Sequence, residues 1–178
     1  MYIFSDQIAG IHDIGIRGLS SIPSLVESGD RFNITVTATN YGDFQENTVL
    51  TLKLNSTILT SINLSLSSGQ SQLIFYSYQT VQPAWGRYTL TSSIPILVGE
   101  NTINQGDNSM SIGPERVSPP GDVNRDGIDN ILDVALVAYS FGSRPGSPTW
   151  NPVADINRDG VVDILDVAQV AFYYRRGV

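Results

Sequence analysis

The residues best suited to chemistry lie in two nearly identical acidic segments of the C-terminal third. Asp122-Val123-Asn124-Arg125-Asp126-Gly127 recurs 33 residues later as Asp155-Ile156-Asn157-Arg158-Asp159-Gly160. Each copy is followed by one further acid, Asp133 or Asp166. Calcium is a hard cation that takes about six to eight oxygen ligands, and such segments are rich in oxygen. We therefore predict one metal-binding loop in each copy.

Counting from the first Asp of each copy assigns the ligands. An EF-hand-type loop supplies oxygen from positions 1, 3, 5, 7, 9 and 12, and glycine at position 6 allows a sharp turn. In the first loop these are Asp122, Asn124, Asp126, the carbonyl of Ile128, Asn130 and Asp133. In the second they are Asp155, Asn157, Asp159, the carbonyl of Val161, Asp163 and Asp166. We expect two calcium ions, preferred over magnesium because so many protein oxygens converge.

The two loops differ from an ordinary EF-hand loop and from each other. Position 12 is Asp in both, which shortens the reach of this ligand compared with the usual Glu. Position 8, where such loops carry an aliphatic residue for pairing between loops, is Asp129 in the first and Val162 in the second. We expect the first site to be weaker or differently shaped.

An apolar helix is predicted after each loop, and each has two apolar stripes. At 100° per residue from Ile131, one stripe spans about 100° of arc and the other lies near 240–300°. The first stripe consists of Ile131, Leu132, Ala135 and Tyr139, with Ile164, Leu165, Ala168 and Phe172 as its counterpart in the second helix. The other consists of Val134, Val137 and Phe141, and of Val167, Val170 and Tyr174. A module this small can bury only one stripe of each helix internally, so the first stripes are predicted to bind a partner.

The repeat also resembles a known family. The run from Gly121 to Gly127, Asp133-Val134-Ala135 and the second copy from Ala154 to Gly160 resemble a dockerin domain, over about residues 119–176. The resemblance implies two loop–helix halves that dock onto a cohesin domain of a scaffoldin or other surface protein. In dockerins, loop positions 10 and 11 are recognition positions. The clostridial pattern has Ser-Thr there, whereas this chain has Ile-Leu twice, which predicts a more hydrophobic interface and allows two binding orientations.

The rest of the chain alternates apolar and polar residues in short runs. In 32–38, for example, Phe32, Ile34, Val36 and Ala38 fall on one face. Runs at 11–19, 32–38, 49–54, 58–66, 73–78, 88–97 and 109–112 are predicted strands, separated by turn signals. About seven short antiparallel strands of this kind predict an Ig-like β-sandwich.

This region resembles the CARDB family, an Ig-like sandwich of bacterial and archaeal surface proteins. The resemblance covers roughly residues 11–113 and is carried by 26–30, 34–42, 64–70 and 86–90. It implies a spacer or adhesive module. The expected fold is thus an all-β Ig-like sandwich (1–113), a Pro-rich linker (114–121) and a small all-α dockerin domain with tandem EF-hand-like loop–helix units (122–178).

Composition narrows the class of partner. The net charge of −7 argues against nucleic acid, no cysteine is present to form a disulfide, and no run reaches the roughly 20 apolar residues of a membrane span. The start, Met1 to Asp6, lacks the basic residues and length of a signal peptide. We expect a fragment, with an added Met1, of an extracellular or cell-surface protein.

No catalytic residues are predicted, because no nucleophile–base pair is recognisable and His12 is expected to be a surface strand residue. Two alternatives to cohesin binding remain. The first stripes could instead pack on the sandwich itself or on residues 142–153, making the C-terminal part a structural calcium module. Alternatively, Tyr76, Tyr78 and Trp85 could form an aromatic sugar-binding platform, making the sandwich a carbohydrate-binding module.

Overall fold

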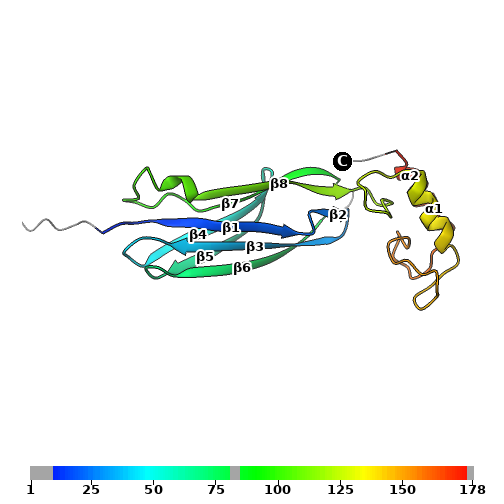
Figure 1. The fold of residues 1–178 in the computed structure, drawn as a ribbon, viewed down its shortest axis with the longest axis horizontal. Coiled ribbons are helices and arrows are strands. Elements are labelled where there is room, and N and C mark those ends of the chain that lie inside the picture. The colour runs from blue at the N-terminus through cyan, green and yellow to red at the C-terminus, as the bar shows by residue number, and fades with distance from the viewer. Residues whose placement is uncertain (1–9, 81–84, 176–178) are drawn as a thin grey trace, which may run out of the picture. The chain divides into compact units, whose positions relative to one another are not determined.

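A computed structural model of the chain describes residues 10–80 and 85–175. The residues considered above for a signal peptide, Met1 to Asp6, lie outside this part. The described elements are eight strands and two α-helices, which are labelled in Figure 1, and one 3-10 helix. They are β1 (Ile14–Ile22), β2 (Leu25–Glu27), β3 (Arg31–Asn40), β4 (Glu46–Leu54), β5 (Thr57–Leu66), β6 (Ser71–Gln79), β7 (Gly86–Ser93), η1 (Gln105–Asp107), β8 (Ser109–Ser118), α1 (Ile131–Ser140) and α2 (Ile164–Tyr173).

The strands form two sheets, with the orders β1-β3-β6 and β2-β8-β7-β4-β5. The period-two patterns explain their inward faces. In β3, Phe32, Ile34, Val36 and Ala38 are all buried, as predicted. β4 pairs antiparallel with both β5 and β7, and its Leu50, Leu52 and Leu54 are buried. The core of the sandwich therefore follows directly from the alternation.

One strand pair contradicts the all-antiparallel prediction. The three-residue strand β2 pairs in parallel with β8, from Leu25 opposite Arg116 to Glu27 opposite Ser118. A strand this short contains too few residues to show a period-two pattern, so it was not among the predicted strands.

The linker prediction also needs correction, because β8 extends through Ser118 into the segment assigned to it. Val117 in this extension is buried. Pro114 lies before the β2–β8 register begins at Arg116, and a strand without a neighbour on one side tolerates a residue without an N–H. Pro114 therefore lies within β8, which ends at Ser118, directly before Pro119.

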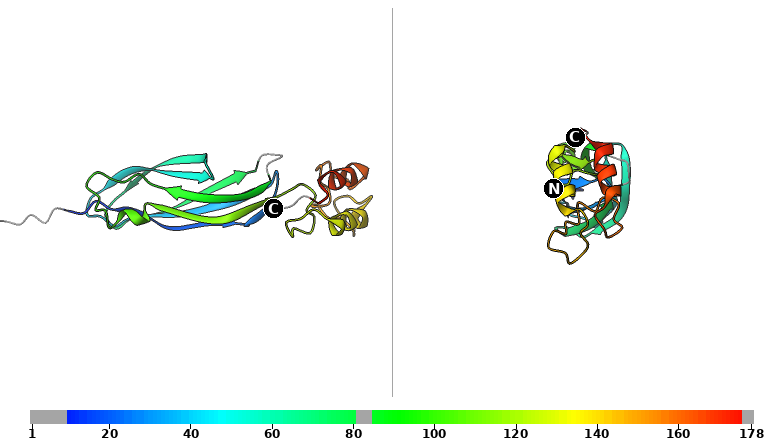
Figure 2. Two further views of the ribbon diagram at one scale, coloured as in Figure 1. Left: turned by 90° about the horizontal axis from the view of Figure 1, so that it is seen from above. Right: turned by 90° about the vertical axis from the view of Figure 1, so that its right-hand side faces the viewer.

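By contacts between residues, the described chain divides into two compact units. The first comprises residues 10–20, 34–76 and 89–112, and the second comprises 21–33, 77–80, 85–88 and 113–175. The α-helices belong to the second unit, where they pack on each other side by side (Figure 2). None of the helices in the described part is long and apolar enough to span a membrane.

The helices surround a small apolar cluster of their own. Its buried members are Val123, Val137, Ala154, Ile156, Val162 and Val170. Val137 and Val170 come from the stripes that were not assigned to a partner, together with the half-buried Val134 and Val167. Phe141 and Tyr174, the last residues of those stripes, are exposed instead. Each follows the last helical residue as C-cap in an extended conformation, so it no longer lies on the helix face.

Candidate functional site

The first loop is organised around two buried carboxylates. Asp122 and Asp133 are fully buried. Asp122 accepts from the backbone N–H groups of Asp126 (3.0 Å) and Gly127 (2.9 Å). Asp133 accepts from Asn124 N–H (2.9 Å) and Asn130 N–H (2.8 Å), which draws the end of the loop back to its start.

The second loop repeats these four hydrogen bonds and adds one from Ile156 N–H to Asp166 Oδ1 (2.8 Å). Asp155 accepts from the N–H groups of Asp159 (3.1 Å) and Gly160 (2.9 Å). Asp166 accepts from Asn157 N–H (3.1 Å) and Asp163 N–H (2.8 Å). The acids shared by the two loops thus accept the same four backbone hydrogen bonds in each.

Each loop has a left-handed backbone conformation at two positions, and these positions produce the tight turn that closes the loop. Position 4 has φ of 60° at Arg125 and 61° at Arg158, and position 6 has φ of 94° at Gly127 and 88° at Gly160. Glycine adopts such angles without strain. The turn brings Asp122 Oδ1 and Asn124 Oδ1 to 3.0 Å and 2.8 Å from the same nitrogen, Asp126 N, so these oxygens converge.

Position 9 has a second task as the N-cap of the following helix. Asn130 Oδ1 accepts from Leu132 N–H (2.9 Å), and Asp163 Oδ1 accepts from Leu165 N–H (2.8 Å). Each N-cap forms a capping box with the position-12 Asp. An Asn has only one side-chain oxygen, so Asn130 is more constrained than Asp163 as a metal ligand.

Position 8 is where the two loops diverge. The backbone of Val162 pairs with the segment after α1, through Val162 N–H to Ser143 O (3.1 Å) and Gly142 N–H to Val162 O (2.7 Å). At the equivalent place, Asp129 O accepts from Arg175 N–H (2.7 Å). The predicted pairing partner of position 8 was the other loop, whereas these bonds join it to the chain beyond a helix.

The carboxylate of Asp129 is fully buried, and neither of its oxygens has a hydrogen-bond partner. Burial, followed by repulsion from Asp133, Asp122 and Glu27, raises the pKa of Asp129 to about 7. Burial also raises the pKa of Asp122, against hydrogen bonds from Ser118 and Gly127 that lower it. The first loop thus concentrates negative charge in a buried place.

This donor set fits calcium. All the predicted ligands are carboxylate, amide or carbonyl oxygens, which a hard cation prefers. Several already converge, and the uncompensated charge around Asp122 is what a bound cation would neutralise.

All eight residues predicted to bind a partner are exposed. The largest of them, Ile131, Leu132, Tyr139, Ile164, Leu165 and Phe172, are each between 55% and 72% exposed. Ala135 and Ala168 are exposed as well. The two helices therefore present the same four positions on their outer faces.

The aromatic residues considered for sugar binding do not form a platform. Tyr76 and Tyr78 are half-buried; the hydroxyl of Tyr76 donates to Leu59 O (3.1 Å), and Tyr78 packs edge-on against the buried Phe32. Trp85 packs edge-on against Tyr173, with ring centroids 5.6 Å apart. His12 is half-buried rather than on the surface, stacked on Phe44 and bonded to Glu46 (2.6 Å).

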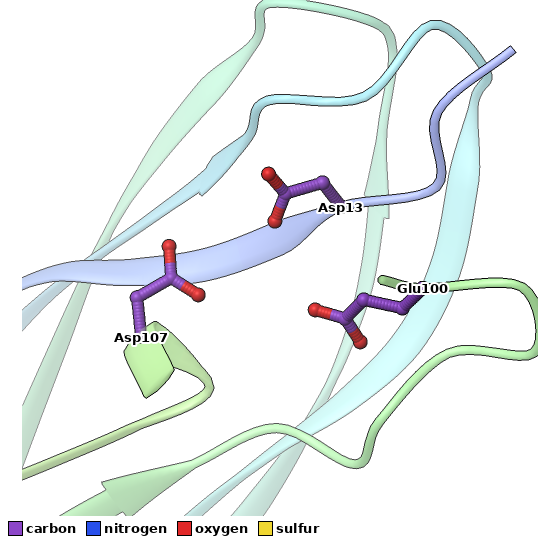
Figure 3. A group of neighbouring side chains, drawn as sticks. All are labelled: Asp13, Glu100 and Asp107. Carbon is purple, nitrogen blue, oxygen red and sulfur yellow. The ribbon is translucent and has the colours of Figure 1, made fainter. Parts of the chain in front are cut away.

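Sequence analysis missed one cluster of carboxylates. Asp13, Glu100 and Asp107 come together in the first unit, as Figure 3 shows. Up to 94 residues of sequence separate them, so no local spacing could have revealed the cluster. The one available signal was a set of acids between predicted strands, which is common on any surface.

Comparison with known proteins supports both predicted resemblances. Residues 120–173 match the family model of the dockerin type I domain. The solution structure of the CARDB domain of PF1109 from Pyrococcus furiosus is similar, at 18% identity, over 61% of this chain and 98% of that one, with a TM-score of 0.52. A crystal structure of that domain in complex with di-metal ions is 16% identical over 57% of this chain and 90% of that one, with a TM-score of 0.49.

No curated protein matches the chain. The similarity to the solution structure supports the CARDB-like fold alone. The order of the parts, a CARDB-like sandwich followed by a dockerin type I match, is the one predicted.

Proposed function

We propose that residues 120–173 are a non-catalytic docking module that binds two calcium ions and, in that form, a cohesin domain. The CARDB-like sandwich would serve as its spacer or adhesive neighbour. The observation that carries this proposal is the combination of two loops with the same hydrogen-bond pattern and two helices exposing the same apolar positions. The dockerin type I match to these residues supports it.

The metal has a structural role in this proposal. The first ion would be held by Asp122, Asn124, Asp126, Ile128 O and Asp133, and the second by Asp155, Asn157, Asp159, Val161 O, Asp163 and Asp166. Asn130, already bonded to Leu132 N–H, would contribute through a water, as position 9 often does. The ions would supply charge compensation that fixes each loop against its helix, in a chain that has no cysteine.

The docking surface would consist of the exposed stripes. An isolated apolar residue on a surface is ordinary, but a contiguous set repeated on two helices indicates an interaction site. Ile131-Leu132 and Ile164-Leu165 occupy the positions through which dockerins recognise cohesins. Because both halves present the same pair, the module could dock in either of two orientations.

Two alternatives are less well supported. A purely structural calcium module would bury the first stripes, and within the described part of the unit that contains the helices nothing covers these eight residues. A sugar-binding sandwich lacks its aromatic platform, since Tyr76 and Tyr78 are turned into contacts with the protein. An extracellular or cell-surface location follows from the module types and belongs to the same proposal.

Calorimetric titration of the whole chain with cohesin domains, in calcium and in EDTA, tests the proposal. We expect binding by at least one cohesin in calcium and none in EDTA. Asp122→Ala with Asp155→Ala should abolish calcium binding at the two loops and, with it, docking. Calcium-independent docking, or no docking to any cohesin, would contradict the proposal.

A second pair of variants separates the surface from the metal. Ile131→Asp combined with Ile164→Asp should weaken docking by about 2 kcal/mol or more while calcium uptake persists. Ile58→Asp is the matched control, because Ile58 is equally exposed (59%) but lies on β5. If each single variant has a small effect and the double variant a large one, both orientations are used.

A further inference from the structure

A separate cluster of carboxylates lies in the first unit, far in sequence from the calcium loops. Asp13 immediately precedes β1, Glu100 follows the turn after β7, and Asp107 ends η1. One oxygen of each lies within 4.8 Å of the others, and Figure 3 shows the three carboxylates turned toward a common space. An isolated parallel bridge between His12 and Glu100 holds the first two segments together.

The hydrogen bonds around the cluster satisfy only one side of each buried carboxylate. Glu100 Oε2 accepts from Leu97 N–H (2.8 Å) and Asn108 Nδ2 (3.0 Å), and Asp13 Oδ2 accepts from Asn104 Nδ2 (3.0 Å). Asp13 Oδ1 and Glu100 Oε1 are buried and have no hydrogen-bond partner. The two residues are only 8% and 7% exposed, so little water can reach these oxygens. Unpaired carboxylate oxygens in so buried a place cost free energy unless a ligand binds them.

Two more oxygen atoms near the cluster are also buried without a hydrogen-bond partner. They are Asp107 Oδ1 and the side-chain oxygen of Asn108, a residue only 4% exposed. Among residues 10–80 and 85–175, no Lys, Arg or His forms an ion pair with any of the three acids. The protein thus gathers up to three negative charges without supplying a positive one.

The surrounding chain is shaped to place Asp107 here. Gly15 in β1 lies directly against the Asp107 carboxylate, and any Cβ at this position would collide with it. A glycine in the middle of a strand lacks a side chain to pack and commonly marks a close approach of this kind. The lack of a side chain at Gly15 therefore lets the Asp107 carboxylate lie directly against β1.

We propose that Asp13, Glu100 and Asp107 form a third cation site, which binds calcium and ties the start of β1 to the segment between β7 and β8. The spacing is compatible with calcium. Oxygens around one calcium ion are separated by at most twice the metal–oxygen distance, about 5 Å. The ligand atoms here lie within 4.8 Å of one another.

An ion could reach this site and complete its coordination there. A pocket of about 380 Å³ is lined by Asp13, Tyr41, Ile103, Asn104 and Asp107. Such a volume holds the waters that would fill the remaining positions. The repulsion between the acids agrees with this role: burial, then Asp107 and then Glu100, raises the pKa of Asp13. Burial and Glu100 likewise raise that of Asp107.

Counting calcium ions on the full chain by calorimetry and elemental analysis tests the site. We expect about three ions on the wild type and about two on Asp13→Asn/Glu100→Gln, whereas Asp43→Asn, an exposed acid of the same unit, keeps about three. Asp122→Ala/Asp155→Ala should keep about one ion. One ion on that variant, combined with no docking of the wild type to any cohesin, would support this site and contradict only the proposed function.

A melting experiment gives a second, independent result. In EDTA the melting temperature of Asp13→Asn/Glu100→Gln should equal or exceed that of the wild type, because repulsion is removed, whereas in calcium it should be lower. If this variant does not fold, Asp107→Asn, altered at a less buried acid, must show the same loss of one ion. No calcium on Asp122→Ala/Asp155→Ala, or an unchanged ion count in the folded acid variants, would overturn the proposal.

Discussion

At Asp129 the first loop places an acid where the second has Val162, and the two backbones are otherwise alike. The pKa of Asp129 is about 7 in the folded, metal-free protein, compared with an ordinary value of 3.8 for an aspartate in the unfolded chain. The folded state therefore binds the proton more tightly, and its stability falls as the pH rises from about 4 to about 7. Above pH 7 the penalty is constant.

Asp129→Asn should remove that penalty. In EDTA at pH 8 the variant should be more stable than the wild type by about 1–3 kcal/mol, and the gain should vanish below about pH 4. In calcium the gain should shrink, because the cation offsets the charge of Asp122 and Asp133. Denaturant unfolding at both pH values measures this, with Asp43→Asn as control. A gain independent of pH would contradict the charge explanation.

Position 9 offers a matched exchange between the loops. Asn130→Asp gives the first loop the residue of the second and keeps a good N-cap, since Asp163 already caps α2. The added carboxylate should tighten the first calcium site by about tenfold, and Asp163→Asn should weaken the second by a similar factor. Titration against a chromophoric chelator at fixed ionic strength measures both. Equal affinities in all three proteins would show that position 9 does not contribute.

At the scale of elements, each helix separates an inward stripe from an outward one. Val137→Ala and Val170→Ala should each destabilise the C-terminal part by about 2 kcal/mol, because both side chains are fully buried. Ile131→Ala, at a residue 62% exposed, should change stability by less than about 0.5 kcal/mol. Chemical unfolding in saturating calcium measures the difference. A similar cost at Ile131 and Val137 would contradict the assignment of the stripes.

The elements also show which features the sequence could reveal. The calcium loops and strand β3 depend on residue spacings within about a dozen positions, so both could be predicted from the sequence. The β2–β8 pair and the acid cluster depend on contacts between distant segments. Val26 comes close to Val117, and Asp13 to Glu100, only after folding. No periodic pattern in the sequence predicts either contact. Val162 pairs beyond helix α1 rather than with the other loop for the same reason.

For the whole molecule, the two parts should depend on calcium to different degrees. The helical part has a small apolar cluster of its own, no disulfide and eight acids in its loops and helix starts. The sheets bury many more apolar side chains, from Ile14 to Val117, and their hydrogen bonds do not involve a metal. Removing calcium should therefore unfold the helices at temperatures where the sheets survive.

Hydrogen exchange read by mass spectrometry, with and without EDTA, measures this directly. Amides of 131–140 and 164–173 should lose protection by at least about tenfold in EDTA, while those of β3 and β4 keep theirs. The third cation site adds a local signature, faster exchange in 97–108 but not in the centres of the strands. Asp122→Ala/Asp155→Ala should reproduce the first change without the second, whereas Asp13→Asn/Glu100→Gln should reproduce the second without the first. Uniform loss of protection along the chain would instead mean that calcium stabilises a single cooperative unit.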